Sequence, residues 1–490
     1  MSLRPAPVRF RGKRRQESFL RPAGPSFRGM GSAPFEEEDQ RARLFEGRAL
    51  LIPLTVLLVG MWVAAGAPGN IGSSSAGALL MLLPMGMLYG AHFFLKRRRP
   101  LSDQMLLPIA GMLIAIGLLV IWRLDPTKAT LHQDAIAWKQ VWWATVGIVV
   151  LIGFASLRNL DFLRRHPYTF AFLGVALVAA TAIFARPLGP DGAKISLPLF
   201  FFSLQPSEPL KILLILFAAG YLESRRDLLN MPFKLKLGPL PITVSLPPVP
   251  ILGPLLIILM IALVLFVVQR DMGSVLLFYG GFVMLLYVAS GRASYVIGGL
   301  GIFLVALLLI KLIMPGWVAT TETRAKIMLD PWTTADAGGN HAGYQLVQAT
   351  YSLGAGGLLG TGIGYGRPQY VPEVHTDLVI IAIGEEFGLF GAVLMLGLFA
   401  LLIYKGLRIA LDAQGGYEQL LAASLAIMLG LQILTILGGS IRLLPLTGIT
   451  VPFISYGGSS LITNCAIIGL LLAISAVGAE QKARSDDAVP

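Results

Sequence analysis

Four short groups of polar and ionisable residues could carry chemistry, and each of them borders a long apolar stretch. They are Gln205-Pro206-Ser207-Glu208 with Lys211, Gln269-Arg270-Asp271-Met272-Gly273, Glu373-Val374-His375-Thr376-Asp377 with the later Glu385 and Glu386, and the segment from Leu444 to Ser460. An ionisable group within a membrane costs free energy, so each one is a functional hypothesis by default. A carboxylate can take a proton from an attacking group, and a cation can bind an anionic headgroup.

The first two groups each have a structural explanation as well as a functional one. Glu208 and Lys211 lie three residues apart at a helix start, so they share a face and can pair with each other. They predict either a neutralised helix cap or the polar wall of an outward cavity that binds an anionic headgroup. Asp271 lies beside Arg270 in a connection too short for a free loop, and an interfacial turn with self-neutralising charges explains this pair equally well.

The third group places Asp377 at the mouth of an apolar helix. Asp is a common helix N-cap, which is the structural alternative to a chemical role. Glu385 is eight residues further on, about 12 Å deeper and about 80° around a regular helix from Asp377. Glu386 falls about 180° away. A helix that is regular from Asp377 would therefore let only Glu385 share its cavity.

The fourth group is rich in Gly, Ser and Pro within an uncharged stretch, and it includes Ser455. Such a composition favours a broken or re-entrant element, which is tolerated at membrane depth only where it is buried in protein or lines a wet cavity. Close helix packing through small residues is the alternative. The glycine-rich run Gly360–Gly366 follows no strand of a βαβ unit, so it does not indicate a dinucleotide site.

The elements that position these groups follow from the composition. Of the 490 residues, 55% are hydrophobic and only 13% are charged, whereas soluble domains average about 25% charged residues. This excludes an ordinary soluble enzyme, a disordered protein and, with one Cys, a disulfide scaffold. The net charge of +12 is typical of cytoplasmic loops in a membrane protein and predicts no nucleic-acid partner.

The chain is predicted to be an all-α polytopic membrane protein. A helix needs about 20 mostly apolar residues to cross the hydrocarbon core. Twelve such runs lie near 49–67, 77–95, 105–122, 141–157, 168–185, 209–222, 251–268, 272–290, 294–314, 378–404, 420–440 and 458–478. Basic clusters such as Lys96–Arg99 and Arg225-Arg226 fall on alternate connections, so the positive-inside rule places both termini in the cytoplasm and all four polar groups on the outer half.

The same pattern divides the chain into segments. Residues 1–48 are expected to form a disordered basic cytoplasmic tail, because their composition cannot bury a core. Residues 49–95 would be two N-terminal transmembrane helices, and residues 479–490 a cytoplasmic C-terminal tail. The long outer segment 315–377 is expected to hold a short helix over Tyr344–Leu359, on or dipping into the interface.

Five motifs in this order resemble the SEDS family of bacterial peptidoglycan glycosyltransferases, which includes RodA, FtsW and SpoVE. The matching residues are Gln205–Glu208, Gln269–Gly273, Gly360–Gly364, Pro372–Asp377 with Ile383–Gly388, and Pro452–Ser459. The resemblance covers about residues 105–478. It implies a ten-helix core with both ends in the cytoplasm of a bacterial cell, to which the first two apolar runs and the tail are additions.

The resemblance also implies an activity at the outer face of the plasma membrane. The family polymerises lipid II, a disaccharide-pentapeptide on an undecaprenyl pyrophosphate carrier, into glycan strands during elongation or division. The acidic residue that is proposed to be catalytic in the family maps onto Asp377. Its carboxylate would act as the general base for an inverting displacement. The implied partner is a class B penicillin-binding protein, the transpeptidase that crosslinks the strands. A flippase for lipid II and a non-catalytic scaffold of the cell-wall machinery are the alternative functions.

Further site residues are expected around Asp377. The candidates for substrate binding are Lys194, Gln205, Ser207, Glu208, Lys211, Asp271, Glu373, His375, Thr376, Glu385 and Ser455. The departing pyrophosphate needs a cation, for which Lys194, Lys211 and Arg270 are candidates, or a divalent metal ion such as Mg²⁺ or Mn²⁺. The sequence departs from the family where Ile195-Ser196 replaces a common Arg-Trp pair, and where Arg270 replaces a common Pro.

Overall fold

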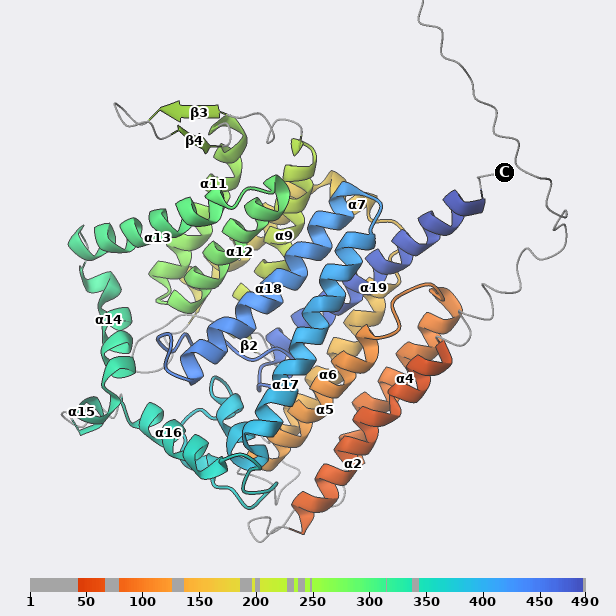
Figure 1. Cartoon of the computed structure of the whole chain (residues 1–490), viewed down its shortest axis with the longest axis vertical. Helices are drawn as coiled ribbons and strands as arrows, with labels where there is room; N and C mark the ends of the chain where they lie inside the picture. Colours follow the sequence, from red (N-terminus) through yellow and green to blue (C-terminus); the bar gives the residue numbers. More distant parts are fainter. Residues whose placement is uncertain are drawn as a thin grey trace, which may run out of the picture.

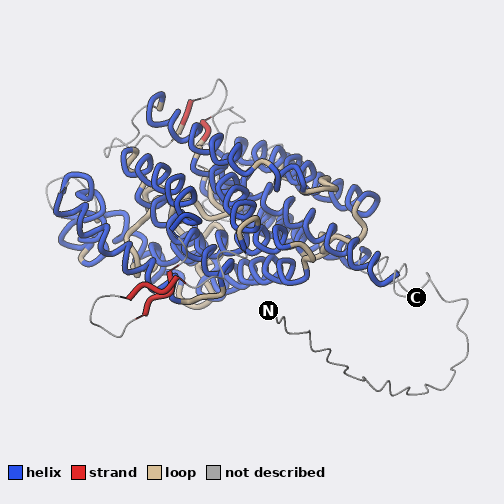
Figure 2. The backbone as a smooth tube through the Cα atoms, turned by 90° about the horizontal axis from the view of Figure 1, so that it is seen from above, coloured by secondary structure: helices blue, strands red, loops and turns tan. Residues whose placement is uncertain are grey.

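Helices dominate the architecture of the chain (Figure 2). The computed structural model describes residues 43–66, 79–125, 136–185, 196–198, 203–226, 233–236, 243–246, 249–313, 315–336 and 343–487. Within these ranges, nine helices are long and apolar enough to cross a membrane. The chain is thus a multi-pass membrane protein, as its composition predicts.

Each of the twelve predicted apolar stretches coincides with a helix. They are α2 (Leu51–Ala65), α4 (Leu82–Arg98), α5 (Leu106–Leu124), α6 (Ile136–Ala155), α8 (Pro167–Phe184), α9 (Ser207–Glu223), α11 (Val249–Val268), α12 (Met272–Ser290), α13 (Ser294–Ile313), α17 (Val379–Asp412), α18 (Gly416–Ser440) and α19 (Gly458–Asp487). Helix α2 has 15 residues and is the shortest of the set, and α4 and α9 have 17 residues each.

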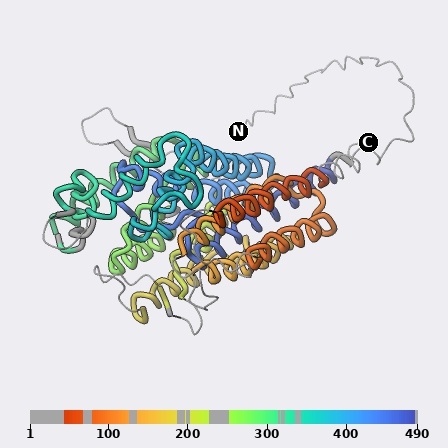
Figure 3. Tube along the Cα trace, turned by 90° about the horizontal axis from the view of Figure 1, so that it is seen from below, coloured from red at the N-terminus to blue at the C-terminus, as the bar shows by residue number. Residues whose placement is uncertain are grey.

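The two additional N-terminal helices pack along one side of the bundle, α2 against α5 and α4 against α6 (Figures 1 and 3). Buried charges join the N-terminal end of the first helix to the C-terminal end of α4. The Arg43 guanidinium donates to Pro100 O at 3.0 Å and to Arg99 O at 2.7 Å, and it pairs with Glu46. A side chain that is buried and bonded in this way belongs to a folded helix.

The predicted disordered tail therefore extends too far at its C-terminal boundary. The first membrane span begins at Arg43, so residues 43–48 are helical rather than disordered. The rest of the predicted N-terminal tail lies outside the described residues. At the other end α19 continues to Asp487, past the boundary expected at residue 478. The polar final turns continue the helix because Arg99 pairs with Glu480 at 2.9 Å.

Two short antiparallel hairpins correct the all-α description. Strand β1 (Leu197–Pro198) pairs with β2 (Ser203–Leu204), and β3 (Phe233–Lys236) pairs with β4 (Thr243–Leu246). A search for apolar runs long enough to form helices cannot detect β-strands of only two to four residues. The β1–β2 hairpin matters for the site because it leads directly into α9. A five-residue helix, α7 (Asp161–Arg165), connects α6 to α8.

The long segment 315–377 is mostly helical where the structure describes it. It contains α14 (Pro315–Leu329), α15 (Pro331–Asp336), α16 (Tyr344–Gly356) and a 3₁₀ turn, η1 (Pro368–Tyr370). The short helix predicted at 344–359 is confirmed as α16, which ends at Gly357 with φ of +52°. Helices α13 and α14 lie at the edge opposite α2 (Figures 1 and 3). No residue of the apolar window of α13 is buried, so this helix is peripheral.

The interior of the bundle is formed by α5, α18 and α19. Helix α19 packs along α6, and α18 packs along α17. Gly117 in α5 allows an irregular segment after α18 to lie directly against the helix. A Cβ at this position would lie 2.5 Å from Phe453 O and 2.8 Å from the Ile454 Cα. These contacts are with backbone, which cannot move aside as a flexible side chain can.

The Gly117→Ala variant is expected to destabilise the protein. Overpacking a well-packed interior costs about 1–3 kcal/mol, which should lower the midpoint of thermal unfolding in detergent. The matched control is Gly397→Ala in α17, where a Cβ meets nothing within 4 Å. That change should stabilise by up to about 1 kcal/mol, because Ala is the better helix former. Equal melting temperatures for the two variants would contradict the close approach at Gly117.

Candidate functional site

A large polar cavity of about 1230 Å³ lies between the start of α6, β2, α14, the turn before α17 and the start of α19. Its lining residues are Trp138, Lys139, Trp142, Trp143, Val146, Ser196, Ser203, Gln205, Arg324, Glu373, Thr376, Asp377, Gly448, Thr450, Tyr456, Gly457, Gly458, Ser459 and Ser460. Four of the predicted site residues meet here, namely Gln205, Glu373, Thr376 and Asp377. The cavity is the candidate active site.

The predicted broken element forms one wall of this cavity. Residues 441–457 contain no helix or strand, and their backbone turns sharply at Gly448 and Phe453, whose φ angles are +71° and +65°. Because this segment is not helical, its backbone N–H and C=O groups form hydrogen bonds with neighbouring side chains and loops instead. Tyr456 N donates to His375 O at 2.8 Å, and Gln140 Nε2 donates to Ser455 O at 3.1 Å.

Asp377 lies half-buried in the turn that precedes α17. It is not a helix N-cap, because α17 begins at Val379 and its N-cap position is Leu378. Burial raises the pKa of the Asp377 carboxyl to about 6, and the nearby Glu373 charge adds to this increase. The Arg324 charge and a hydrogen bond from Thr376 act in the opposite direction. A carboxyl with this pKa is mostly ionised near neutral pH and can accept a proton.

Ser455 and His375 fix the turn that carries Asp377. The Ser455 hydroxyl accepts from Val451 N at 2.9 Å and donates to Thr376 O, so it joins the broken element to the turn. The backbone carbonyl of His375 accepts from Tyr456 N. These two residues were predicted to bind substrate, but they do not line the cavity, and the structure gives them a positioning task.

Glu208 and Lys211 lie beneath the broken element instead of in the cavity wall. Lys211 Nζ is 2.7 Å from Glu208 Oε2 and donates to Gln432 Oε1 at 2.8 Å. Gln432 Nε2 in turn donates to Thr450 O at 2.8 Å. Both ionic side chains are almost fully buried. The two side chains form a network that supports the broken element, instead of the predicted contact with substrate. Ser207 lines the same small void of about 10 Å³ as they do.

Asp271 is a helix N-cap, a structural role that differs from the predicted interfacial turn with self-neutralising charges. Its carboxylate caps α12, accepting from Ser274 N at 3.0 Å and from Ser274 Oγ at 2.6 Å. It borders the small void and does not line the large cavity. Arg270 forms the turn with φ of +63° and is also absent from the cavity wall. Lys194, the remaining predicted cation, lies outside the described residues.

Glu385 does not share the cavity of Asp377, and this expectation is corrected. The helix is not regular from Asp377, so the 80° rotation does not apply. The Glu385 carboxylate instead accepts from Arg367 N. Glu386 pairs with Arg123 at 3.0 Å and accepts from Gly364 N at 3.2 Å. The two acids thus clamp the glycine-rich loop against α17.

Sequence reasoning missed two cations in the cavity wall, Arg324 on α14 and Lys139 on α6. Arg324 Nη1 donates to Leu446 O at 3.0 Å. Arg324 could have been suspected as a charge in the long outer segment, but the sequence does not show where α14 places it. Lys139 lies at a helix start beside a predicted outer connection, and nothing in its local spacing distinguishes it from an interfacial anchor.

An aromatic wall beside Lys139 was also missed. Trp138 and Trp142 stack edge to face with ring centroids 5.8 Å apart, and Tyr456 is a further aromatic residue of the lining. Trp143 packs flat over Gly458, where a Cβ would come within 2.5 Å of the ring. The i, i+4 spacing of the first pair was the available signal. Aromatic faces of this kind suit the apolar faces of sugar rings.

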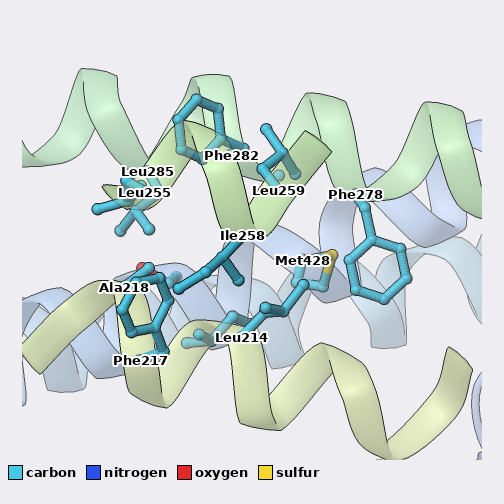
Figure 4. Close-up of a pocket in the computed structure, with 13 residues that line it drawn as sticks. Leu214, Phe217, Ala218, Leu255, Ile258, Leu259, Phe278, Phe282, Leu285 and Met428 are labelled. Carbon is cyan, nitrogen blue, oxygen red and sulfur yellow. The ribbon is translucent and has the colours of Figure 1, made fainter. Parts of the chain in front are cut away.

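A second, apolar pocket of about 40 Å³ lies between α9, α11, α12 and α18 (Figure 4). Leu214, Ile258 and Met428 point into it, with Phe282 above and Phe278 at one side. None of its thirteen lining residues ionises. The pocket offers no acid, base or cation, so the chemistry of the protein is assigned to the polar cavity.

Sequence comparisons identify relatives of the whole core. A family model for FtsW, RodA and SpoVE, described as a cell cycle protein, matches residues 103–480. The peptidoglycan glycosyltransferase RodA of Mycobacterium tuberculosis is 36% identical over 393 residues, covering 79% of this chain and 81% of that protein. A probable peptidoglycan glycosyltransferase FtsW of Geobacter metallireducens is 30% identical over 382 residues, covering 76% and 94%.

Solved structures share the fold. A structure described as "Structural coordination of polymerization and crosslinking by a peptidoglycan synthase complex" matches with a TM-score of 0.60 at 24% identity, covering 76% of this chain and 97% of that one. The rod shape determining protein RodA of Thermus thermophilus matches with a TM-score of 0.53 at 23% identity, covering 76% and 96%. With the motifs, the bundle and these matches in agreement, the chain belongs to the FtsW/RodA/SpoVE family.

Proposed function

We propose that this chain is a peptidoglycan glycosyltransferase that polymerises lipid II into glycan strands. The observation that carries the proposal is the half-buried Asp377 carboxylate in a polar cavity large enough for sugars. The curated relatives named above carry the same activity in their names. These names favour glycosyl transfer over flipping.

The proposed reaction is a single displacement at the anomeric carbon of the donor. The 4-hydroxyl of the acceptor sugar attacks this carbon, and the Asp377 carboxylate takes the hydroxyl proton. The bond from the anomeric carbon to the pyrophosphate oxygen breaks, and its electron pair leaves with the pyrophosphate. One displacement by a single base inverts the configuration at that carbon. The aromatic wall formed by Trp138 and Trp142 would hold the sugars in position.

The membrane arrangement is part of the proposal. Trp142 is 50% exposed and Val146 is 39% exposed, and both line the cavity from the flank of a membrane-spanning helix. A substrate on a lipid carrier could therefore reach Asp377 from the bilayer. The basic connections support an orientation with both termini in the cytoplasm and the cavity on the outer side of the plasma membrane.

A class B penicillin-binding protein is the proposed partner. The structural relative is described as a peptidoglycan synthase complex that coordinates polymerisation and crosslinking. A transpeptidase beside the cavity would crosslink strands as they emerge. The experiments below therefore use the chain together with this partner.

Replacing the proposed base is expected to abolish polymerisation. The Asp377→Asn variant keeps the size of the side chain but cannot accept the proton, and loss of a general base typically costs about 10²–10⁴-fold in rate. The assay measures glycan strands formed from lipid II by the reconstituted chain and its partner. The control is Asp330→Asn, which alters an exposed carboxylate of the same outer segment that does not line the cavity. Normal polymerisation by the Asp377→Asn variant would exclude Asp377 as the base.

The rate is expected to depend on pH through the same group. Because burial raises the pKa of Asp377 to about 6, the carboxylate is ionised above this pH and protonated below it. Activity should therefore be high at pH 7 and above, and fall about tenfold by pH 5. The turnover rate measured from pH 5 to pH 8 checks this. A rate that is flat over this range would argue against a base with this pKa.

A divalent cation, Mg²⁺ or Mn²⁺, is proposed to bind together with the substrate. Within the described parts of the chain, no group of three or more His, Cys, Asp or Glu side chains could hold a metal ion. Mg²⁺ is often bound by one or two carboxylates together with substrate phosphates. Glu373, which lines the cavity with a 65% exposed side chain, would supply the protein ligand. The cation would neutralise phosphate charge.

Removal of divalent cations is accordingly expected to slow polymerisation. A chelator should reduce glycan formation from lipid II, and added Mg²⁺ or Mn²⁺ should restore it. The Glu373→Gln variant should need a higher cation concentration for half-maximal rate. Full activity in the chelator would rule the cation out.

A further inference from the structure

Gln140 is a buried amide on α6 that does not line the cavity holding Asp377. Its side chain is 1% exposed, and its Nε2 donates to Ser455 O at 3.1 Å. Its Oε1 is buried and has no hydrogen-bond partner within the described residues. A buried acceptor without a partner costs free energy, whereas an apolar side chain of the same shape does not. Packing alone therefore does not explain an amide at this position, and its donor needs a task.

The bond from Gln140 continues through the peptide unit that joins Ser455 to Tyr456. The carbonyl of this unit accepts from Gln140, and its N–H donates to His375 O at 2.8 Å. The unit is planar and trans, so the two bonds fix its orientation from opposite edges. Hydrogen bonds that share a peptide unit also polarise and strengthen each other. The donor of Gln140 thus supports a bond to His375, two residues before Asp377.

The two peptide units that precede Asp377 are both bound by the same turn of the broken element. The carbonyl of the His375–Thr376 unit accepts from the N–H of the unit that Gln140 holds. The carbonyl of the Thr376–Asp377 unit accepts from the Ser455 hydroxyl. That hydroxyl accepts from a backbone N–H at 2.9 Å, so its single hydrogen is directed at Thr376 O. The backbone leading into Asp377 is therefore fixed over two consecutive planes.

The turn that provides these bonds, residues 451–456, is itself held by helices. Ser455 N donates to Val451 O at 3.1 Å, which closes the turn. Helix α5 lies directly against its backbone at Gly117, and α6 binds it through Gln140. A shift of the turn relative to α6 would therefore also move the backbone of Asp377.

Resting on the proposed function, we infer that Gln140 is a positioning residue for Asp377 and acts through the peptide unit between Ser455 and Tyr456. A general base must reach the hydroxyl that it deprotonates at about 2.6–3.2 Å. A misplacement of about 1 Å in such a geometry can cost about a hundredfold in rate. Substrate contacts the cavity wall, which Gln140 does not line. Loss of the Gln140 donor should therefore slow the chemical step and leave substrate binding intact.

The first test removes the donor and keeps the size of the side chain. The full chain with its transpeptidase partner is reconstituted in vesicles, and glycan formation from lipid II gives kcat and KM. Gln140→Met should lower kcat about ten- to a hundredfold and leave KM within about twofold. Gln140→Asn keeps the amide but is one methylene shorter. It should show the same loss of kcat, and it gives the reading if Gln140→Met does not fold.

The matched control is Gln269→Met. Gln269 is also a buried amide that donates to a backbone carbonyl, Val178 O at 2.8 Å, but this bond joins the end of α11 to α8. The control should lose stability much as Gln140→Met does and keep its kcat. Thermal unfolding of each sample compares the two losses of stability. Equal losses of kcat in the two variants would reveal a general effect of destabilisation and would overturn the assignment.

A double variant separates positioning of the base from any other effect of Gln140. In the Asp377→Asn background the base is already absent, so adding Gln140→Met should leave the residual single-turnover rate unchanged. A further fall of this rate by the factor seen in the single variant would overturn the positioning role. An unchanged kcat in both Gln140→Met and Gln140→Asn would overturn it as well.

Failure of the proposed function gives a different result. If the unaltered protein forms no glycan from lipid II, or if Asp377→Asn polymerises at the normal rate, the proposed function or its base is wrong, and the role of Gln140 falls with it. Normal glycan formation that is lost in Asp377→Asn but retained in Gln140→Met would leave the proposed function standing and reject only the positioning role.

Discussion

The need to satisfy the backbone of residues 441–457 inside a membrane protein is the constraint on which the rest of the structure depends. Away from water, unpaired N–H and C=O groups cost several kcal/mol each, and helices normally satisfy them. Here the helix is absent, and neighbouring side chains replace it. Gln432 binds Thr450 O, Gln140 binds Ser455 O and Arg324 binds Leu446 O. The cavity exists because these bonds keep an irregular wall in place.

This constraint explains why some charged residues that look functional are structural. Lys211 and Glu208 orient Gln432, and both are buried where a lone charge would be costly. Removing one partner of a buried ion pair typically costs about 3–5 kcal/mol. If a substitution at Lys211 abolishes activity, the first explanation is therefore a destabilised fold and not a lost contact with substrate. Asp377 differs because its carboxyl lines the cavity itself.

The glycine-rich loop shows the same principle on the other side of the site. Helix α17 breaks at Gly388, whose φ is +69°. The N–H groups of Leu389 and Phe390, just beyond the break, donate to Gly357 O and Leu358 O at 3.0 Å and 3.1 Å. Glycines fit this contact because a Cβ at Gly360 would lie 2.3 Å from Glu386 O. The glycine-rich loop therefore pairs its backbone with the unpaired backbone of a broken helix and is not a nucleotide-binding loop.

Much of the fold could be predicted from the sequence, because runs of about 20 apolar residues directly reflect the thickness of the bilayer. Each predicted apolar run coincides with a helix, and the broken element was predicted separately from its Gly, Ser and Pro content. The hairpins were not, because two-residue strands leave no hydrophobic period. In the site, the predicted residues Asp377, Glu373, Thr376 and Gln205 line one cavity, and their roles in catalysis and substrate binding stay predictions. Arg324 and Lys139 were missed, because only tertiary packing brings α14 and α6 to the same wall.

The central claim is that Asp377 performs the chemistry and does not merely hold the substrate. The most direct measurement is a single-turnover rate of glycosidic bond formation with saturating substrate, made beside a lipid II binding measurement on the same Asp377→Asn sample. The account predicts binding close to that of the unaltered protein together with a rate reduced at least about a hundredfold. A normal single-turnover rate, or a loss of activity explained entirely by lost binding, would contradict it.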